Sequence, residues 1–238
     1  MQLFHLSYEL IKIEWDSLTV FSVPDLVSQL RKVMRIKKGD YIWVQTNKDN
    51  ETLRYKISVE DWTDQEVSWK IIETQIFQVW EKNVSMFIAM PNKREKAELV
   101  VQKLTEIWVS NIYFWVSEHS IIRERNEKKA DRLKKISCEA VEQSRWTILP
   151  RIEYLKSDIE ILQAVSAKQV FLANQWWASL NNYSTKWCND ICGIIGPEWW
   201  FSENDLNIFK MANIVDLWEN VLRMETASII LARLLKNQ

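Results

Sequence analysis

The chain has 238 residues, a formal net charge of −1, 47% apolar residues and 26% charged residues, which is an ordinary balance for a soluble globular protein. It contains no run of about 18 apolar residues and no basic-then-apolar leader, so we expect a cytoplasmic protein without a membrane span. The near-neutral charge excludes nucleic-acid binding through overall charge alone, so any such affinity must come from local basic patches.

Residues 1–75 are predicted to form mainly β-structure. Aromatic and β-branched residues alternate partly over four segments that polar turns separate: residues 3–7, 41–46, 53–59 and 67–73. One helix is expected to begin at Pro24, because apolar residues recur at helical spacing from Leu26 to Met34. The end of that helix carries several basic residues, namely Arg31, Lys32, Arg35, Lys37 and Lys38. They form either a solvated charged face or a patch that contacts phosphates.

Strands and helices are predicted to alternate over residues 76–238, which we take as a second domain. The expected strands are residues 84–90, 111–117, 169–174, 191–196 and 213–217. The expected helices are residues 94–107, 124–143 and 225–235, with another after Ser202. Such alternation favours an α/β fold with a mostly parallel sheet, in which ligands bind beyond the carboxyl ends of the strands. The loops after Asn174, Gly196 and Leu217 are therefore the expected places for chemistry.

The residues that several common enzyme classes require are missing. With only His5 and His119, a Ser-His-Asp triad or a histidine metal site has little support. The glycine-rich fingerprints of dinucleotide-binding and nucleoside-triphosphate-binding loops are absent as well. The three cysteines, Cys138, Cys188 and Cys192, lack metal-site spacing and are expected to be reduced and buried. We therefore expect no metal cofactor.

Two segments at consecutive expected strand ends carry the strongest signal: GPEWWFS at residues 196–202 and LWENVLRMETA at residues 217–227. By themselves they could be a tight turn and a helix start with a surface ion pair. They resemble, however, the GPEGGFS and LGxxILRxETA motifs of the RsmE family of 16S ribosomal RNA uridine N3-methyltransferases. Residues 33–40, 91–120 and 136–150 resemble further family motifs in the same order, so the resemblance covers nearly the whole chain.

The resemblance implies a fold, a reaction and partners. The fold is α/β, a SPOUT trefoil-knot methyltransferase domain at residues 76–238 that follows a PUA-like β-barrel RNA-binding domain at residues 1–75. The implied cofactor is S-adenosylmethionine, and the implied reaction is methylation of N3 of a uridine in 16S rRNA of the small ribosomal subunit. Members of the family are homodimers.

The matched positions also give site residues. The implied cofactor pocket consists of Ala173, Asn174, Ile195, Gly196, Pro197, Glu198, Leu217, Trp218, Val221, Leu222 and Thr226. Arg223 is the expected catalytic cation, Glu198 is expected to orient the pocket or handle the N3 proton, and Glu225 is expected to brace Arg223. RNA contacts are expected from the five basic residues of the first domain together with Arg123, Arg125 and Arg145. The chain departs from the family motifs at Leu3, Ser28, Gln29 and His119.

The numbers of glycines and tryptophans are abnormal. The chain has 3 glycines and 14 tryptophans, and together these equal the glycine count expected at this length, since glycine makes up about 7% of an average protein. At Trp108, Trp199, Trp200 and Trp218 the family motifs carry glycine. We hypothesise that these codons are UGA read as glycine in the source organism, whereas Trp43 and Trp115 could be genuine.

Genuine tryptophans would favour an alternative, a non-catalytic protein that binds RNA or assists ribosome assembly on the same scaffold with a blocked cofactor pocket. A related SPOUT methyltransferase that acts on another RNA is a third reading, because the sequence does not identify the target base.

Overall fold

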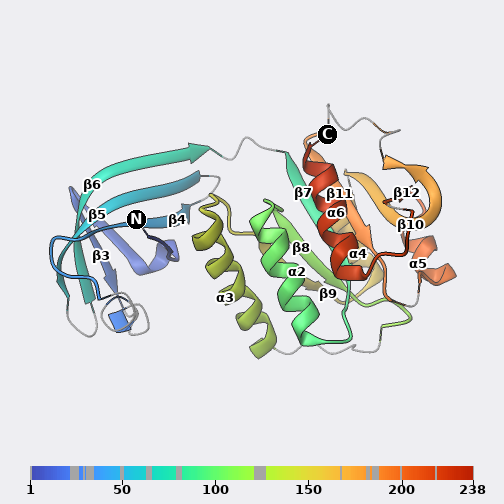
Figure 1. The fold of residues 1–238 in the computed structure, drawn as a ribbon, viewed down its shortest axis with the longest axis horizontal. Helices are drawn as coiled ribbons and strands as arrows, with labels where there is room; N and C mark the ends of the chain where they lie inside the picture. Colours follow the sequence, from blue (N-terminus) through green and yellow to red (C-terminus); the bar gives the residue numbers. More distant parts are fainter. Residues whose placement is uncertain are drawn as a thin grey trace. The chain divides into compact units, whose positions relative to one another are not determined.

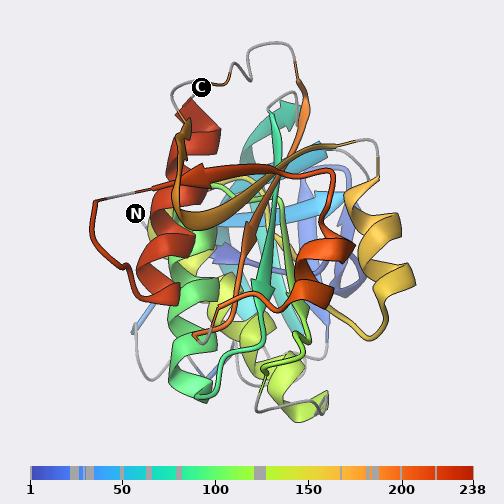
Figure 2. The ribbon, with the colours of Figure 1, turned by 90° about the vertical axis from the view of Figure 1, so that its right-hand side faces the viewer.

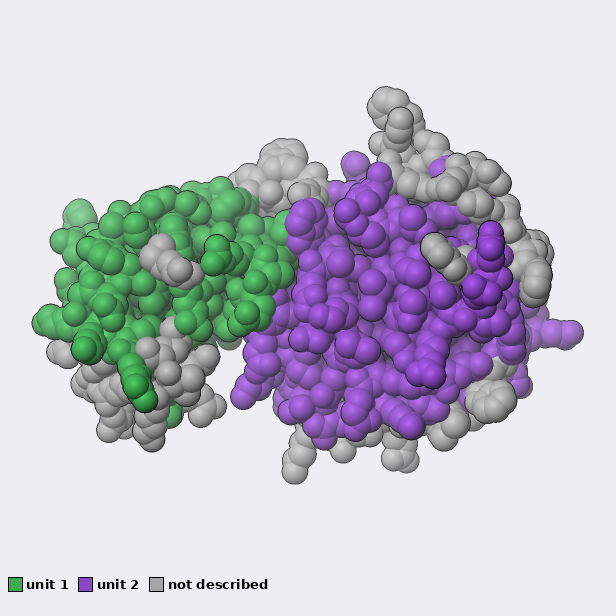
Figure 3. Space-filling view, viewed as in Figure 1, with its two compact units in different colours: residues 1–80, 141–148 green, residues 81–140, 149–238 purple. Residues whose placement is uncertain are grey.

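The computed structural model describes residues 2–21, 27–28, 30, 35–48, 51–62, 66–78, 82–120, 127–166, 168–180, 183, 188–198, 200–217 and 219–237. The chain divides into two compact units (Figure 3). Unit 1 comprises residues 1–80 and 141–148, and unit 2 comprises residues 81–140 and 149–238. Most of the helix expected after Pro24 lies outside the described residues, as do Arg31, Lys32, Arg123, Arg125, Trp199 and Trp218.

Unit 1 is built on a six-stranded sheet with the order β1-β4-β5-β6-β3-β2 (Figure 1). Its elements are β1 (Leu3–His5), the 3₁₀ helix η1 (Tyr8–Leu10), β2 (Ile11–Glu14), β3 (Ser17–Phe21), β4 (Tyr41–Lys48), β5 (Glu51–Trp62) and β6 (Glu66–Gln78). Apolar side chains from β1, β3, β4, β5 and β6 meet in a single core around Trp69, which is fully buried. The alternation of buried and exposed residues along β3 and β6 puts one face of each strand on this core.

A buried polar network joins the β1 and β4 strands of unit 1 to residues 141–148. Nε2 of His5 lies 2.8 Å from Oδ1 of Asn47, and the amide nitrogen of Asn47 donates to Oγ1 of Thr52 and to the carbonyl of Thr147. Because Asn47 uses its amide nitrogen on these acceptors, its Oδ1 must accept, and neutral His5 therefore carries its proton on Nε2. Burial lowers the pKa of His5 below its ordinary value of 6.5, and the hydrogen bond to Asn47 opposes this only partly.

We expect the stability of the protein to fall as the pH drops below about 6.5, the ordinary pKa of histidine. The unfolded chain binds the proton of His5 more tightly than the folded chain, so the contribution is complete above this pH and is lost toward the lower folded-state pKa. Urea unfolding of His5→Gln between pH 5 and 8 should show a flatter pH dependence than the parent. Equal slopes for the parent and His5→Gln would contradict this assignment.

Unit 2 is a six-stranded sheet with the order β12-β10-β11-β7-β8-β9, and all of its neighbouring strands are parallel. The strands are β7 (Asn83–Ala89), β8 (Asn111–Trp115), β9 (Arg151–Leu155), β10 (Gln169–Ser179), β11 (Asp190–Ile195) and β12 (Asn213–Asp216). The helices are α2 (Arg94–Glu106), α3 (Glu127–Ser144), α4 (Asp158–Val165), α5 (Glu203–Ile208) and α6 (Met224–Asn237). The central strands β7, β8 and β11 are almost entirely buried, as expected of a parallel sheet covered on both faces.

Helices cover both faces of this sheet (Figure 2). Met86 and Ile88 of β7 point to a core shared with α2 and α6, whereas Phe87 and Ala89 of the same strand point to a core shared with α4 and α5. Gly193 of β11 allows α6 to approach closely, because a Cβ there would lie 2.7 Å from the sulfur of Met86 and 2.9 Å from Leu231. The result is a three-layer α/β/α unit that places the carboxyl ends of its strands along one edge.

Candidate functional site

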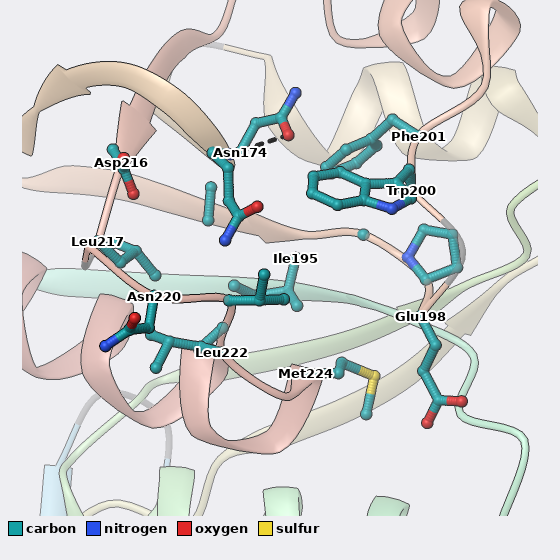
Figure 4. Close-up of a pocket in the computed structure, with 16 residues that line it drawn as sticks. Asn174, Ile195, Glu198, Trp200, Phe201, Asp216, Leu217, Asn220, Leu222 and Met224 are labelled. Carbon is teal, nitrogen blue, oxygen red and sulfur yellow. Dashed lines mark hydrogen bonds between the residues drawn. The ribbon is translucent and has the colours of Figure 1, made fainter.

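A hollow of about 160 Å³ lies at the carboxyl ends of β11 and β12, beside the middle of β10 (Figure 4). Three segments form it. β10 supplies Ala173, Asn174 and Gln175 where its pairing with β12 becomes irregular, so the loop expected after Asn174 is wrong: the strand continues to Ser179. The end of β11 and the following loop supply Ile195, Gly196, Pro197, Glu198, Trp200 and Phe201, and the segment from β12 into α6 supplies Asp216, Leu217, Asn220, Val221, Leu222, Met224 and Ala227. Apolar side chains such as Ile195 and Leu222 face polar ones such as Asn174 and Asp216. This combination suits a ligand with a flat apolar part and several hydroxyl or charged groups.

Most residues expected in the cofactor pocket line this hollow. They are Ala173, Asn174, Ile195, Gly196, Pro197, Glu198, Leu217, Val221 and Leu222. Thr226 does not line it, since it points outward from the first turn of α6 while Met224 and Ala227 point inward. Trp218 lies outside the described residues. Trp200, which the family resemblance places at a glycine position of the pocket, lines the hollow too. Sequence reasoning missed Gln175, Phe201, Asp216, Asn220, Met224 and Ala227, all of which are within three residues of an expected one.

The loop after β11 packs tightly because Gly196 has no side chain. A Cβ at this position would lie 2.7 Å from the ring of Phe201, so any other residue would displace that ring. The loop then enters α5 through a capping box, in which the Ser202 hydroxyl accepts from the backbone nitrogen of Asp205 and the Asp205 carboxylate accepts from that of Ser202. These contacts set the path of the backbone along one wall of the hollow.

Asp205 also fixes the loop that follows β8. Its carboxylate accepts a hydrogen bond of 2.6 Å from the Ser117 hydroxyl and one of 3.3 Å from the backbone nitrogen of Glu118. Asp205 is only 1% exposed, so these bonds are made away from water. The β8–α3 loop, which carries His119 and Ser120, is therefore held against the start of α5.

Replacing Asp205 by alanine is expected to destabilise the protein by about 3 kcal/mol, because three donors, the buried Ser117 hydroxyl and two part-buried backbone nitrogens, would lose their buried acceptor at once. Urea unfolding with a linear extrapolation measures this loss. Glu203→Ala provides the matched control, since Glu203 is an exposed carboxylate in the same helix and should change stability by less than about 0.5 kcal/mol. Equal effects of the two substitutions would show that Asp205 does not hold the two loops together.

Glu198 belongs to a charged cluster at the edge of the hollow. Its carboxylate forms an ion pair with Lys96 of α2 and accepts a hydrogen bond of 2.8 Å from the Asn92 side chain. Figure 4 shows the Glu198 side chain pointing away from Trp200. Lys96 also lies 4.0 Å from a carboxylate oxygen of Glu225. The brace expected between Glu225 and Arg223 is thus replaced by a contact with Lys96, a residue that the sequence motifs did not single out.

Arg223 is exposed immediately before α6, and among the described residues its side chain makes no ion pair. Its neighbours in the chain, Leu222 and Met224, line the hollow, although Arg223 itself does not. Its carbonyl accepts from the backbone nitrogen of Ala227, which fixes the first turn of α6. Arg223 is therefore an exposed cation between two residues that line the hollow.

The expected RNA-contacting residues that the structure describes all lie in unit 1. Arg35, Lys37 and Lys38 are exposed around the Lys37–Asp40 turn, where the Asp40 carboxylate accepts from the backbone nitrogen of Lys37. Arg145 is exposed too, and its carbonyl accepts a hydrogen bond of 3.0 Å from the guanidinium of Arg54. Arg54 therefore adds a cation beside Arg145.

Three tryptophans occupy backbone conformations that favour glycine. Trp15, Trp108 and Trp200 have φ values of 56°, 74° and 72°, in the left-handed region that side chains with a Cβ disfavour. Trp15 is the first central residue of the two-residue turn between β2 and β3, where glycine is usual in a type II′ turn. Sequence reasoning identified Trp108 and Trp200 but missed Trp15.

Trp108 ends α2 in a Schellman motif, in which glycine is the usual residue at this position. Its backbone nitrogen donates to the carbonyl of Thr105, and that of Val109 donates to the carbonyl of Leu104. By contrast, Trp69 and Trp115 are fully buried, and Trp115 packs against Phe201 and Phe209. The structure thus separates three tryptophans with a left-handed backbone conformation from two that fill a core.

Among the described residues, no group of three or more His, Cys, Asp or Glu side chains could hold a metal ion. Cys192 is buried, and burial raises the pKa of its thiol; Cys138 and Cys188 are half-buried, and none of the three forms a disulfide. In the part of the chain that the structure describes, no helix is both long and apolar enough to cross a bilayer.

Known structures share this fold. Ribosomal RNA small subunit methyltransferase E from Neisseria gonorrhoeae, bound to S-adenosyl methionine, superimposes with a TM-score of 0.81 at 18% identity, covering 100% of this chain and 97% of its own. A methyltransferase candidate from Legionella pneumophila in complex with the same cofactor has a TM-score of 0.79 at 21% identity, covering 100% and 98%. Likenesses at this identity establish the fold alone, and the expected arrangement, an α/β domain after an N-terminal β-domain, is confirmed.

By sequence, no curated protein matches the chain. Residues 79–236, by contrast, match the family described as an RNA methyltransferase domain. That match spans well over half of the chain and includes all three segments of the hollow. The chain therefore belongs to the RNA methyltransferase family.

Proposed function

We propose that this protein transfers the methyl group of S-adenosylmethionine to N3 of a uridine in 16S rRNA. The observation that carries the proposal is the hollow itself: nine residues chosen from the motifs alone come together there from three segments. The two solved structures described above contain the same cofactor, and the motifs at residues 196–202 and 217–227 resemble those of uridine N3-methyltransferases. A parallel sheet binds its ligand at this edge.

The side chains that line the hollow are of the chemical types that S-adenosylmethionine requires. Leu217, Ile195 and Leu222 would contact the adenine, while Asn174, Asp216 and Asn220 would bond to the ribose or the amino acid part. The available volume of about 160 Å³ is below the usual range of ligand pockets, about 300–1,000 Å³. Trp200 contributes an indole to the wall at a glycine position, so glycine at this position would enlarge the hollow.

The cofactor supplies an activated methyl group on a positively charged sulfur. N3 of uridine must lose its proton and form the new N–CH₃ bond, while the C–S bond breaks and its electron pair stays on the sulfur. The chain must align N3 with the methyl group, accept or relay the N3 proton, and stabilise the negative charge that spreads onto O2 and O4. Arg223 is the proposed donor to that charge. Glu198, held by Lys96 and Asn92, is the proposed group for the proton.

We further propose that residues 1–75, with the exposed Arg35, Lys37 and Lys38, act as the PUA-like RNA-binding domain and that residues 76–238 form the catalytic domain. Arg145 would add to the RNA-binding surface. From the resemblance to the uridine N3-methyltransferase motifs, we also propose that the protein is a cytoplasmic homodimer and acts on the small ribosomal subunit. Phosphate contacts of this kind give an affinity that decreases with salt.

A second candidate function is that of a non-catalytic RNA-binding protein on the same scaffold. The small volume of the hollow and the position of Trp200 in its wall favour this function if the tryptophans are genuine.

The two functions are separated by ribosomal RNA from cells with and without the gene. Mass spectrometry of the digested 16S rRNA should detect N3-methyluridine only where the gene is present. Identical nucleoside profiles from the two kinds of cell would contradict the enzymatic function. A gene-dependent methyl group on another nucleoside would show that the enzyme has a different target.

A further inference from the structure

One lysine and two carboxylates form a cluster where the loop after β11, the first turn of α2 and the first turn of α6 come together. Lys96 forms an ion pair with Oε1 of Glu198 and lies 4.0 Å from Oε2 of Glu225. We propose that the three side chains act as one proton acceptor, an inference that rests on the proposed function. In this unit the ammonium group of Lys96 changes its ion-pair partner from Glu198 to Glu225 when Glu198 takes the N3 proton.

The contacts of the cluster leave Glu225 ready to receive the ammonium group. Oε2 of Glu225 is buried and has no hydrogen-bond partner among the described residues, and a buried acceptor without a donor is costly. The ammonium group of Lys96 carries three N–H donors, and its bond to Glu198 uses one of them. A rotation of the lysine side chain that shortens the distance of 4.0 Å to a hydrogen bond would therefore satisfy Oε2 of Glu225.

The charges of the cluster explain why two carboxylates are needed. They add to −1 when both carboxylates are ionised and to zero after one of them has taken up a proton. All three side chains are partly shielded from water, with exposed fractions of 23% for Lys96, 30% for Glu198 and 14% for Glu225. If the lysine had only one partner, protonation of that partner would leave a shielded charge unpaired, which is strongly unfavourable. The second carboxylate removes this penalty.

The positions of the two carboxylates decide which one takes the proton. Glu198 lines the hollow, whereas Glu225 does not and is in the first turn of α6, where the helix dipole favours a negative charge. Oε2 of Glu198 accepts a hydrogen bond of 2.8 Å from Asn92, which holds the carboxylate when Lys96 turns away. The electron pair of the N3–H bond stays on N3 and forms the N–CH₃ bond, while the proton goes to Oε1 of Glu198. Lys96 and Glu225 are thus positioning residues.

The polar side chains around the cluster come from three segments. Asn92 precedes α2, Glu225 begins α6, and His119 belongs to the loop after β8 and lines a small space together with Glu198. Of these, His119 is the titratable side chain outside the cluster. Each protein is therefore measured both with the native residue and with His119→Gln, so that titration of the ring is separated from that of the carboxylates.

Single-turnover rates of methyl transfer between pH 5 and 9 test the proposal through opposite shifts. In Lys96→Met the two carboxylates lack a cation, so Glu198 holds its proton more tightly and the loss of rate at low pH should begin about one unit higher. In Glu225→Gln only the lysine remains beside Glu198, so this loss should begin about one unit lower. Lys96→Arg should stay close to the parent because it keeps the charge. Lys103→Met is the matched control, since Lys103 pairs with Glu106 on the same helix, and it should leave the profile unchanged.

A second measurement does not depend on activity. Carbon-13 NMR of the glutamate carboxyl groups in the full chain, with Glu198 assigned from the signal lost in Glu198→Gln, should show the same opposite shifts. Glu225→Gln preserves the shape of the side chain and decides the question alone if Lys96→Met does not fold. Shifts in one direction, unchanged profiles in both variants, or an equal shift in Lys103→Met would overturn the inference. No methylation by the parent, with the opposite shifts present in the NMR signal, would instead count against the proposed function.

Discussion

Replacing Arg223 by alanine is expected to lower the rate of methyl transfer by about 10²–10³-fold, the usual effect of removing a donor that stabilises developing negative charge. Arg223 is exposed at the start of α6, between two residues that line the hollow. Its guanidinium remains charged and can donate two hydrogen bonds to a base carbonyl or a phosphate. Single-turnover transfer of a labelled methyl group to 16S rRNA measures the effect.

The substitution should leave the fold intact, since no ion pair of the Arg223 side chain is found in the described part of the chain. The free energy of unfolding should therefore change by less than about 0.5 kcal/mol. Arg233→Ala is the matched control: Arg233 is exposed on α6, and its guanidinium donates to Asn237, far along the helix from the hollow. Near-normal turnover of Arg223→Ala, or an equal loss in Arg233→Ala, would overturn the assignment.

Trp200→Gly should bind S-adenosylmethionine about tenfold or more tightly than the parent, a gain of about 1.4 kcal/mol or more. Trp200 lines the hollow, and its indole stands where the family motif has glycine. Removing the side chain enlarges the space and lets the ligand approach the backbone. Titration calorimetry of the two proteins measures the difference.

Trp200→Ala separates the volume of the indole from the conformation of the backbone. Both variants enlarge the hollow, but only glycine relieves the φ of 72°, which should make Trp200→Gly more stable than Trp200→Ala by about 1 kcal/mol. Trp115→Gly is the opposite control, because Trp115 is fully buried and its loss should cost about 3–5 kcal/mol. If Trp200→Gly neither binds S-adenosylmethionine more tightly than Trp200→Ala nor is more stable than it, position 200 does not require glycine.

The elements of the catalytic fold that sequence patterns located are those with continuous apolar runs. Residues 84–90, 111–117 and 191–196 were predicted as strands, and the corresponding β7, β8 and β11 are buried on both faces. β9 was missed because only Leu155, its last residue, is buried, so the strand lacks both a continuous run and an alternation. β2 was missed for the same reason, since it is almost wholly exposed. The periodicity of apolar residues does not show whether a chain passes through one of its own loops. The trefoil knot is therefore expected only from the resemblance to the family motifs.

The loops after β11 and β12 were predictable because parallel strands bring their carboxyl ends to one edge. The loop expected after Asn174 was wrong, because β10 continues to Ser179. What the sequence could not give is the direction of side chains within those loops. Thr226 matches a family motif, yet the first turn of α6 points Met224 and Ala227 into the hollow instead. Lys96 is far from Glu198 and Glu225 in the chain, and only the packing of α2 beside α6 makes it their partner. The φ values of Trp15, Trp108 and Trp200 likewise become visible only in the folded backbone.

Methyl transfer in a purified system tests the central claim most directly. The chain with glycine at positions 108, 199, 200 and 218 would be incubated with S-adenosylmethionine and small ribosomal subunits that lack the modification, and the digested RNA analysed by mass spectrometry. The account predicts N3-methyluridine at one site in the 16S rRNA, with much less product from the chain as printed. No methylated uridine from the glycine-containing chain, despite a native fold and bound RNA, would contradict it.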